Sequence, residues 1–247
     1  MKDKLIPKRL GKEPLVEAVC ELRFKSDKDS ISDLLPGLIF QKLRDKFPKI
    51  EKLPASNLPP VVLKNDPDLR YAPTVKLIGE LYSIMLGEHI CAVSSTRPYS
   101  GWDQFSTMIT ELLKILNDTS LITHPERISL KYIDILPNKD GFMLDALNLD
   151  IQIGDHHITT APFQLRTEIN DNEFLGVIQI ASPAHTILRT GERLSGILID
   201  IDIISRSMPD DFWEKPKIFL DKAHIMGKSK FFDILKTETI RRLDPEI

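Results

Sequence analysis

The chain has 247 residues, of which 42% are apolar, 28% charged and 7% aromatic, and its formal net charge is -3. The apolar content excludes a disordered chain, because it supplies enough buried surface to offset the entropy that the chain loses on folding. The near-neutral charge argues against a globally basic nucleic-acid binder. No run approaches the roughly 18 apolar residues that a membrane-spanning helix needs.

Two cysteines, Cys20 and Cys91, are too few for a disulfide scaffold. Each lies in a run typical of a buried strand, so we interpret both as core residues in a reducing compartment. The segment 1–14 is charged but lacks both a following apolar core and a small-residue cleavage site, unlike a secretory signal. We therefore expect a cytoplasmic protein.

The segment from 15 to 24 follows Pro14 and alternates apolar with polar residues. This period of two predicts a strand with one solvated face. From 30 to 47, apolar residues recur at four-residue steps, which predicts a helix. Ser30 or Ser32 is expected to cap this helix, because a serine hydroxyl accepts hydrogen bonds from the free N–H groups of a first turn.

The segment from 49 to 73 contains five prolines. We expect an extended connector on the surface, with one short strand at 61–63. Beyond it, Gly79-Glu80 and Gly87-Glu88 divide an apolar region as tight turns. Three short strands are predicted there, at 75–78, 81–86 and 90–94.

A second striped helix is predicted over 101–116. Ser100 and Asp103 resemble a capping box at its start, with Asp in place of the usual Glu. The following segment, 127–136, is typical of a strand.

The second half of the chain is richer in strands. Alternation over 163–169 and again over 174–181, with a turn signal between them, predicts a hairpin. A further strand is predicted at 196–204. The segment 213–243 predicts one long or broken terminal helix, in which Gly227 is a plausible kink.

This order of elements predicts the α+β class, with largely antiparallel sheets in two β-rich halves and helices packed on one face. The N-terminal half spans 1–137. The C-terminal half spans 138–247 and combines the hairpin with the terminal helix. We expect the two halves to form one integrated unit.

Two aspartates and one glutamate are the candidate metal ligands. Asp200 and Asp202 fall on the same face of a predicted strand, roughly 7 Å apart by strand rise. Two carboxylates at that spacing suit a hard divalent cation, and Glu168 would be a third ligand if its strand is adjacent. The alternative is a solvated strand face, or pairing of the aspartates with Arg166 or Arg193.

A basic segment near the C-terminus is the candidate surface for nucleic acid or a partner. Its lysines would contact phosphates, while the simpler alternative is an amphipathic helix with a solvated face. Gly227-Lys228-Ser229 looks like the end of a phosphate-binding loop, but the earlier glycine that this motif needs is replaced by a lysine. The lysines of this segment are Lys215, Lys217, Lys222, Lys228 and Lys230.

A second cluster holds Arg97, Tyr99 and Trp102, the residue types that dominate interface energetics. We predict an interaction site there, with Trp102 as a core anchor at a helix start as the alternative.

Catalytic and cofactor signals are weak. No two histidines have the i, i+4 spacing of a helical zinc site, no Gly-x-Ser-x-Gly elbow occurs, and we expect no cofactor. His156-His157 is expected beside a loop tip. His224 would be held neutral by Lys228 if the two side chains are close.

Three segments carry a family resemblance: Glu13 to Phe24, Tyr99 to Phe105, and Glu126 to Asp134. With them, the chain resembles a sporadically distributed family of uncharacterised prokaryotic proteins of about this length. The third segment departs from the family pattern, with Ser129 and Lys131 in place of Gly and Arg, and with Asp134 in place of Asn. The resemblance implies no catalytic residues, and the patchy distribution implies an accessory or defence-type role.

The sequence therefore favours a non-enzymatic protein that binds another protein or a second copy of itself, in a prokaryotic accessory or defence-type system. A nucleic-acid binder or metal-dependent nuclease is the second alternative. A small-ligand sensor with a cleft between the halves is the third. No membrane partner is expected.

Overall fold

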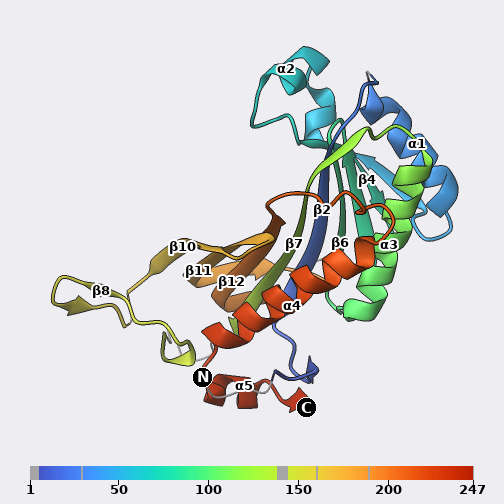
Figure 1. Cartoon of the computed structure of the whole chain (residues 1–247). Helices are drawn as coiled ribbons and strands as arrows, with labels where there is room; N and C mark the ends of the chain where they lie inside the picture. The colour runs from blue at the N-terminus through green and yellow to red at the C-terminus, as the bar shows by residue number, and fades with distance from the viewer. Residues whose placement is uncertain (1–5, 29, 138–143, 160, 189, 247) are drawn as a thin grey trace.

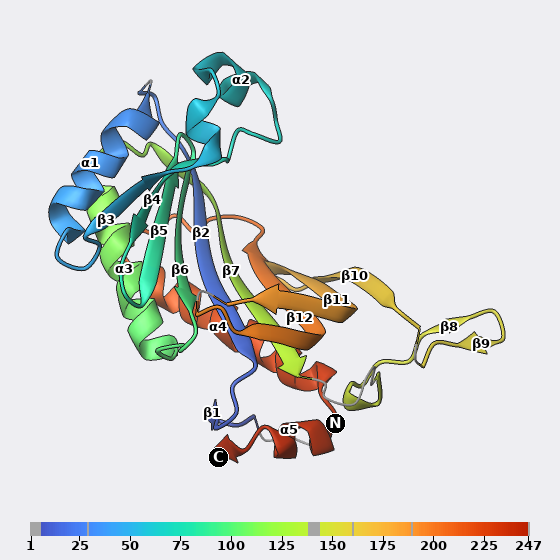
Figure 2. The same cartoon turned by 180° about the vertical axis from the view of Figure 1, so that it is seen from behind.

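A single antiparallel sheet of nine strands organises the molecule, and helices pack on one of its faces, which confirms the predicted α+β class (Figures 1 and 2). The computed structural model describes residues 6–28, 30–137, 144–159, 161–188 and 190–246. Across the sheet the strands run in the order β10 (Phe163–Asn170), β11 (Phe174–Ile187), β12 (Arg193–Ser205), β7 (His124–Pro137), β2 (Leu15–Lys25), β6 (Ile90–Thr96), β5 (Tyr82–Gly87), β4 (Pro73–Ile78) and β3 (Lys49–Lys52).

The covering helices are α1 (Ile31–Leu43), α3 (Trp102–Asp118) and α4 (Pro216–Ile234), and all three lie in front of the sheet in Figure 1. Along the central strand β2 they bury alternate side chains, as the period of a strand requires. On β2 the buried set is Ala18, Cys20, Leu22 and Phe24. Within the described residues, no helix combines the length and the apolar character that crossing a bilayer requires.

The two halves of the sequence meet where β7 pairs with β12. The register runs from Gly196 opposite Pro137 to Ile204 opposite Ser129. At Gly196 the strands approach so closely that an added Cβ would lie 1.9 Å from the Leu136 carbonyl oxygen. Strands from both halves therefore belong to one continuous sheet.

The first and last described segments of the chain lie together below the sheet. There, β1 (Arg9–Leu10) pairs with β13 (Pro245–Glu246), next to α5 (Thr237–Arg242) (Figure 1). The Lys8 N–H donates to the Glu246 carbonyl at 2.8 Å. A separate hairpin of β8 (Gln152–Ile153) and β9 (His156–His157) projects from the body, after the short turn η2 (Leu144–Ala146).

The strand predicted at 61–63 is wrong, because this stretch forms the short helix α2 (Pro60–Asn65) after the turn η1 (Pro54–Asn57). Proline suits the first helical position, where an N–H group would have no partner. The Val62 N–H donates to the Pro59 carbonyl at 2.9 Å and closes the first turn.

The terminal helix is broken, as predicted, but not at Gly227, which lies inside α4. The break comes at Leu235, whose backbone is extended with φ −83° and ψ 140°. The Asn148 side-chain amide donates to the carbonyls of Asp233 and Leu235, both at 2.9 Å. An amide from outside the helix thus donates to two carbonyl groups at the break.

Both capping predictions are wrong. Ser30 and Gly101 are the residues before α1 and α3, and neither makes a side-chain cap. At α1 the Glu88 carboxylate instead accepts the N–H groups of Ile31 at 3.2 Å and Ser32 at 2.9 Å. Glu88 lies 57 residues from Ile31 in sequence, so no local motif announces this cap.

Candidate functional site

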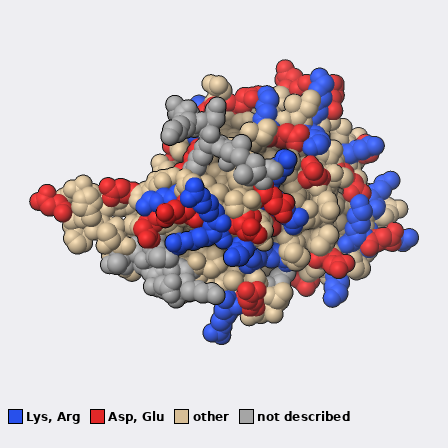
Figure 3. All heavy atoms as spheres, turned by 90° about the horizontal axis from the view of Figure 1, so that it is seen from below, with Lys and Arg blue, Asp and Glu red and all other residues tan. Residues whose placement is uncertain are grey.

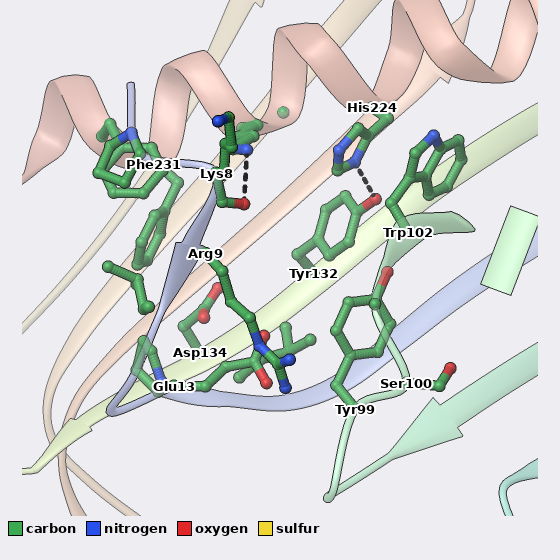
Figure 4. A pocket seen from close by; sticks show the side chains of 18 of the residues that line it. Lys8, Arg9, Glu13, Tyr99, Ser100, Trp102, Tyr132, Asp134, His224 and Phe231 are labelled. Carbon is green, nitrogen blue, oxygen red and sulfur yellow. Dashed lines mark hydrogen bonds between the residues drawn. The ribbon is translucent and has the colours of Figure 1, made fainter. Parts of the chain in front are cut away.

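A pocket of about 560 Å³ opens between the N-terminal segment, the start of α3, β7 and α4 (Figure 4). Its volume falls in the range of small-molecule sites. Strand alternation on β7 directs Tyr132 and Asp134 to the helix-covered face, into this pocket. Side chains from both halves of the sequence line it, among them Lys8, Arg9, Glu13, Tyr99, Trp102, Tyr132, Asp134, His224, Lys228 and Phe231.

Gly227 lets α4 approach the sheet at this point. A Cβ on Gly227 would lie 3.3 Å from Ile203 Cγ1 and 3.5 Å from the ring of Tyr132. The glycine therefore serves close packing of helix on sheet, and it places the next residue, Lys228, and the preceding turn with His224 over the pocket.

His224 belongs to an aromatic wall. Its ring stacks on Trp102, with centroids 4.3 Å apart and planes 4° from parallel. Its Nδ1 lies 2.7 Å from the Tyr132 hydroxyl, and the Trp102 Nε1–H donates to Asp221 at 2.7 Å. His224 Nδ1, the Tyr132 hydroxyl and Trp102 Nε1 are thus each held by a partner, which fixes the orientation of the three rings.

The pKa of His224 is lowered to about 4, first because burial disfavours the imidazolium and then because of the positive charge of Lys228. The predicted influence of Lys228 is confirmed. The imidazole is therefore neutral near pH 7, and it acts in this wall as a flat, uncharged ring.

Asp134 forms the acidic floor of the pocket. It is 5% exposed, and in the described part of the chain no group donates a hydrogen bond to its carboxyl. Burial raises the pKa of this carboxyl well above its ordinary value, and the charges of Glu13 and Asp200 raise it further. Burial also raises the pKa of Glu13, against the lowering effect of Arg9 and Arg97.

A second polar group in the pocket lacks a partner. The Tyr99 hydroxyl is buried without a well-formed hydrogen bond to any described residue. Burial raises its pKa, with smaller contributions from Glu13 and Tyr82. Figure 4 shows this hydroxyl directed toward the space between Tyr132 and Trp102.

Positive charges stand at the mouth. Lys8 and Arg9 are exposed on the N-terminal segment, and Arg9 extends across the opening (Figure 4). Lys228 Nζ donates to the Lys8 carbonyl at 3.1 Å, so α4 holds this segment in place. Burial lowers the pKa of Lys228. The pocket therefore has an acidic floor and a basic mouth.

The structure brings the predicted interaction residues to this pocket. Tyr99 and Trp102 line it, and Arg97 donates from Nη2 to the Glu13 carbonyl at 2.8 Å. Trp102 also packs against Phe105 of α3, so its predicted alternative as a core anchor agrees with the structure.

The five lysines of the basic segment do not form a common basic surface. Lys215 pairs with Asp211 at 3.2 Å, Lys217 with Asp221 at 3.0 Å, and Lys222 with Glu173 at 2.7 Å. Lys228 faces the pocket described above, whereas Lys230 lies near the turn between β10 and β11. Figure 3 shows one whole face of the molecule, and Lys and Arg side chains alternate there with Asp and Glu.

The candidate metal ligands are not assembled as predicted. Asp200 and Asp202 do share one face of β12, but Lys131 Nζ lies 3.8 Å and 3.7 Å from their carboxylates. Glu168 is separated from them by β11 and pairs with Arg166 at 2.7 Å. Among the described residues, no group of three or more His, Cys, Asp or Glu side chains could hold a metal ion.

Other sequence candidates also find plain structural roles. Cys20 and Cys91 are buried, and burial raises the pKa of both thiols. Lys228 lies in the middle of α4, so the resemblance to a phosphate-binding loop has no strand-to-helix turn to support it. His156-His157 follows the turn of the exposed hairpin β8–β9, as expected.

Sequence reasoning missed the acidic floor. One signal was available, because Asp134 follows Ile128, Leu130 and Tyr132 at the buried register of a strand. A carboxylate at such a position is rarely buried without a partner. Comparison with known proteins finds no family model that matches the chain and no curated protein that matches it, so the site is interpreted from its own geometry.

Proposed function

We propose that the protein binds a small organic molecule in the pocket between α3, β7 and α4, and that it works as a ligand sensor rather than as an enzyme. The observation that carries this proposal is Asp134, whose carboxyl lines the pocket, is 5% exposed and accepts no hydrogen bond from any residue that the structure describes. Native proteins pair nearly all buried polar groups, so an exception in a cavity is best explained by a ligand that completes the pairing.

The structure supports this function over nucleic-acid binding. Three of the five lysines in the basic segment already pair with acidic neighbours, which reduces the charge available for phosphates. The pocket also joins the segment before β2 to α4 from the far end of the chain. A bound molecule would therefore contact both halves, as a sensor requires.

The test is a thermal-shift screen with amino acids, sugar phosphates, nucleotides and polyamines. At about 100 times its Kd, a ligand adds about 2.7 kcal/mol of stability, or roughly 5–10 °C in Tm for a chain of this size. We expect at least one class to shift the wild type and not Asp134→Leu. Asp202→Leu, on the opposite face of the sheet, is the matched control and keeps the shift. If no class distinguishes Asp134→Leu from the control, the proposal is wrong.

Binding of a partner protein is the second candidate, and it rests on α4. Ile218 and Ile225 stand seven residues apart on this helix and are 58% and 64% exposed. About two helical turns separate them, so they lie on the same side of α4, and neither lines the pocket described above. We propose that a partner protein binds this apolar face of α4, in the accessory or defence-type system that the family resemblance implies. A protein that co-purifies with the wild type but not with the double variant Ile218→Ser, Ile225→Ser would support this proposal. The same co-purified proteins in both would argue against it.

A further inference from the structure

Resting on the proposed function, we infer that the ligand is a nucleoside monophosphate, whose base meets Asp134 on the pocket floor and whose phosphate meets Lys8, Arg9 and Lys228 at the mouth. The shared chemistry is a planar nitrogen heterocycle that carries an anionic group.

The floor requires a group with adjacent hydrogen-bond donor and acceptor. Asp134 is buried among acidic neighbours, with Glu13 before β2 and Asp200 on β12, and these favour its protonated form together with burial. A protonated carboxyl offers one donor and one acceptor side by side. Amide-like and amidine-like edges of nucleobases offer the complementary pair.

The other charged and titratable groups around the floor do not supply a hydrogen-bond partner for the Asp134 carboxyl. Arg9 from β1 lies near Glu13, and its charge lowers the pKa of Glu13 rather than neutralising Asp134. On α4, His224 is neutral near pH 7, and Lys228 donates to the Lys8 carbonyl. Tyr132 is bonded to His224, and the nearby Tyr99 hydroxyl is a second polar group that is buried without a well-formed hydrogen bond to any described residue.

The walls suit a flat ring. Tyr99, Trp102, Tyr132 and Phe231 line the space above Asp134 and present aromatic surface from three elements (Figure 4). The face of an aromatic side chain can stack on any nucleobase, and each such stack contributes about 1–3 kcal/mol to the free energy of binding. A ring held on its faces by these residues would direct its polar edge to the floor.

The mouth suits an anion. Lys8 and Arg9 are exposed there, and Lys228 stands beside them on α4. The N-terminus of the 17-residue helix α3 opens on the same pocket without a side-chain cap, and its dipole favours negative charge. Asp103 in the first turn of α3 also lines the pocket, so the positive charges of Lys8, Arg9 and Lys228 must outweigh one carboxylate there. A phosphate at this position would keep contact with solvent, so it would not pay the full cost of burying a dianion.

Isothermal titration with AMP, GMP, CMP and UMP, their nucleosides and ribose 5-phosphate tests the assignment. We expect at least one monophosphate to bind at least about tenfold tighter than both its nucleoside and ribose 5-phosphate. Lys228→Met should remove most of the advantage of the phosphate. Asp134→Leu should weaken binding at least about tenfold, through loss of the buried hydrogen bonds. Asp134→Asn keeps one hydrogen-bond donor and one acceptor, so it should bind the monophosphate about as tightly as the wild type. Circular dichroism confirms that each variant is folded.

The pH dependence gives an independent readout. Because the protonated form of Asp134 would contact the base, wild-type affinity should fall as pH rises through the raised pKa of this carboxyl, whereas the affinity of Asp134→Asn should lack that fall. If no monophosphate binds, or if Asp134→Leu binds as tightly as the wild type, the inference is wrong. A different compound that stabilises the wild type but not Asp134→Leu would then overturn only the ligand class and leave the proposed function standing.

Discussion

His224 shows how burial sets the chemistry of a single side chain. The ring lies between Trp102 and Tyr132, and its pKa falls to about 4 because the imidazolium would be desolvated beside Lys228. A histidine that stays neutral near pH 7 can hold an aromatic wall in place without adding charge to the pocket. The same desolvation acts on Asp134 in the opposite direction and raises its pKa.

The lowered pKa of His224 predicts a loss of stability in acid. Between the unfolded pKa near 6.5 and the folded pKa of about 4, the unfolded chain binds a proton that the folded chain does not. Stability should therefore be intact above pH 6.5 and fall toward pH 4, by about 3 kcal/mol at most.

Urea unfolding of the wild type and His224→Gln between pH 7.5 and 4.5 measures this effect. The buried carboxyls titrate in both proteins, so the difference between the two curves isolates the imidazole. The difference in the free energy of unfolding between the wild type and His224→Gln should shrink as pH falls. A difference that stays constant with pH would contradict the lowered pKa of His224.

At the residue scale, the sequence singled out three of the pocket residues, but it predicted other roles for them: an interaction site for Tyr99 and Trp102, and a surface for nucleic acid or a partner for Lys228. Tyr99 and Trp102 were recognised because their residue types favour recognition sites, and Lys228 was recognised by charge. Asp134 and Glu13 were not recognised as site residues, because an acidic side chain acquires this role only when distant segments bury it. Sequence alone shows no such burial.

At the scale of elements, the strands and long helices follow the hydrophobic periodicity closely, but their ends do not. The start of α1 is fixed by Glu88, whose carboxylate accepts the N–H groups of Ile31 and Ser32. Ser30, the residue that local rules select, is left-handed with φ 60° and makes no cap. Tertiary contacts thus decide where this helix begins, and local motifs could not predict it.

This arrangement predicts that substitutions of Glu88 and Ser30, both at the start of α1, have different effects on the stability of the protein. Glu88→Ala should destabilise the protein by about 1 kcal/mol, because two N–H groups at a helix start lose a charged acceptor. Ser30→Ala should change stability by less than about 0.5 kcal/mol, because the hydroxyl caps nothing. Thermal unfolding of both variants compares them directly, and an equal loss in both would show that Glu88 is not the cap.

At the scale of the whole molecule, the pairing of β7 with β12 merges the two halves of the sequence into one sheet. The α+β class and the hairpin of β10 and β11 were predicted correctly, because strand alternation and turn signals are local. The order of the strands was not predicted, because the pairing of strands from different halves leaves no local signal. That order is what separates Glu168 from Asp200 and brings α4 over the pocket.

A continuous sheet predicts cooperative unfolding of both halves. Trp213 lies just before α4 in the C-terminal half, whereas Trp102 in α3 belongs to the N-terminal half and contacts α4 through His224 and Asp221. Single-tryptophan variants Trp213→Phe and Trp102→Phe should each give one urea transition, after correction for the stability of each variant by circular dichroism. Fluorescence and circular dichroism should agree within each variant. An early fluorescence transition in only one of them would show that the halves unfold separately.

The central claim is that a small molecule occupies the pocket lined by Trp102 and Asp134. The most direct measurement is a fluorescence titration of Trp213→Phe, in which Trp102 is the remaining tryptophan, with the compound that gives the largest thermal shift. We predict a saturable change in Trp102 emission that is absent when Asp134→Leu is added to the same background. An unchanged emission, or an equal response in the presence of Asp134→Leu, would contradict the account.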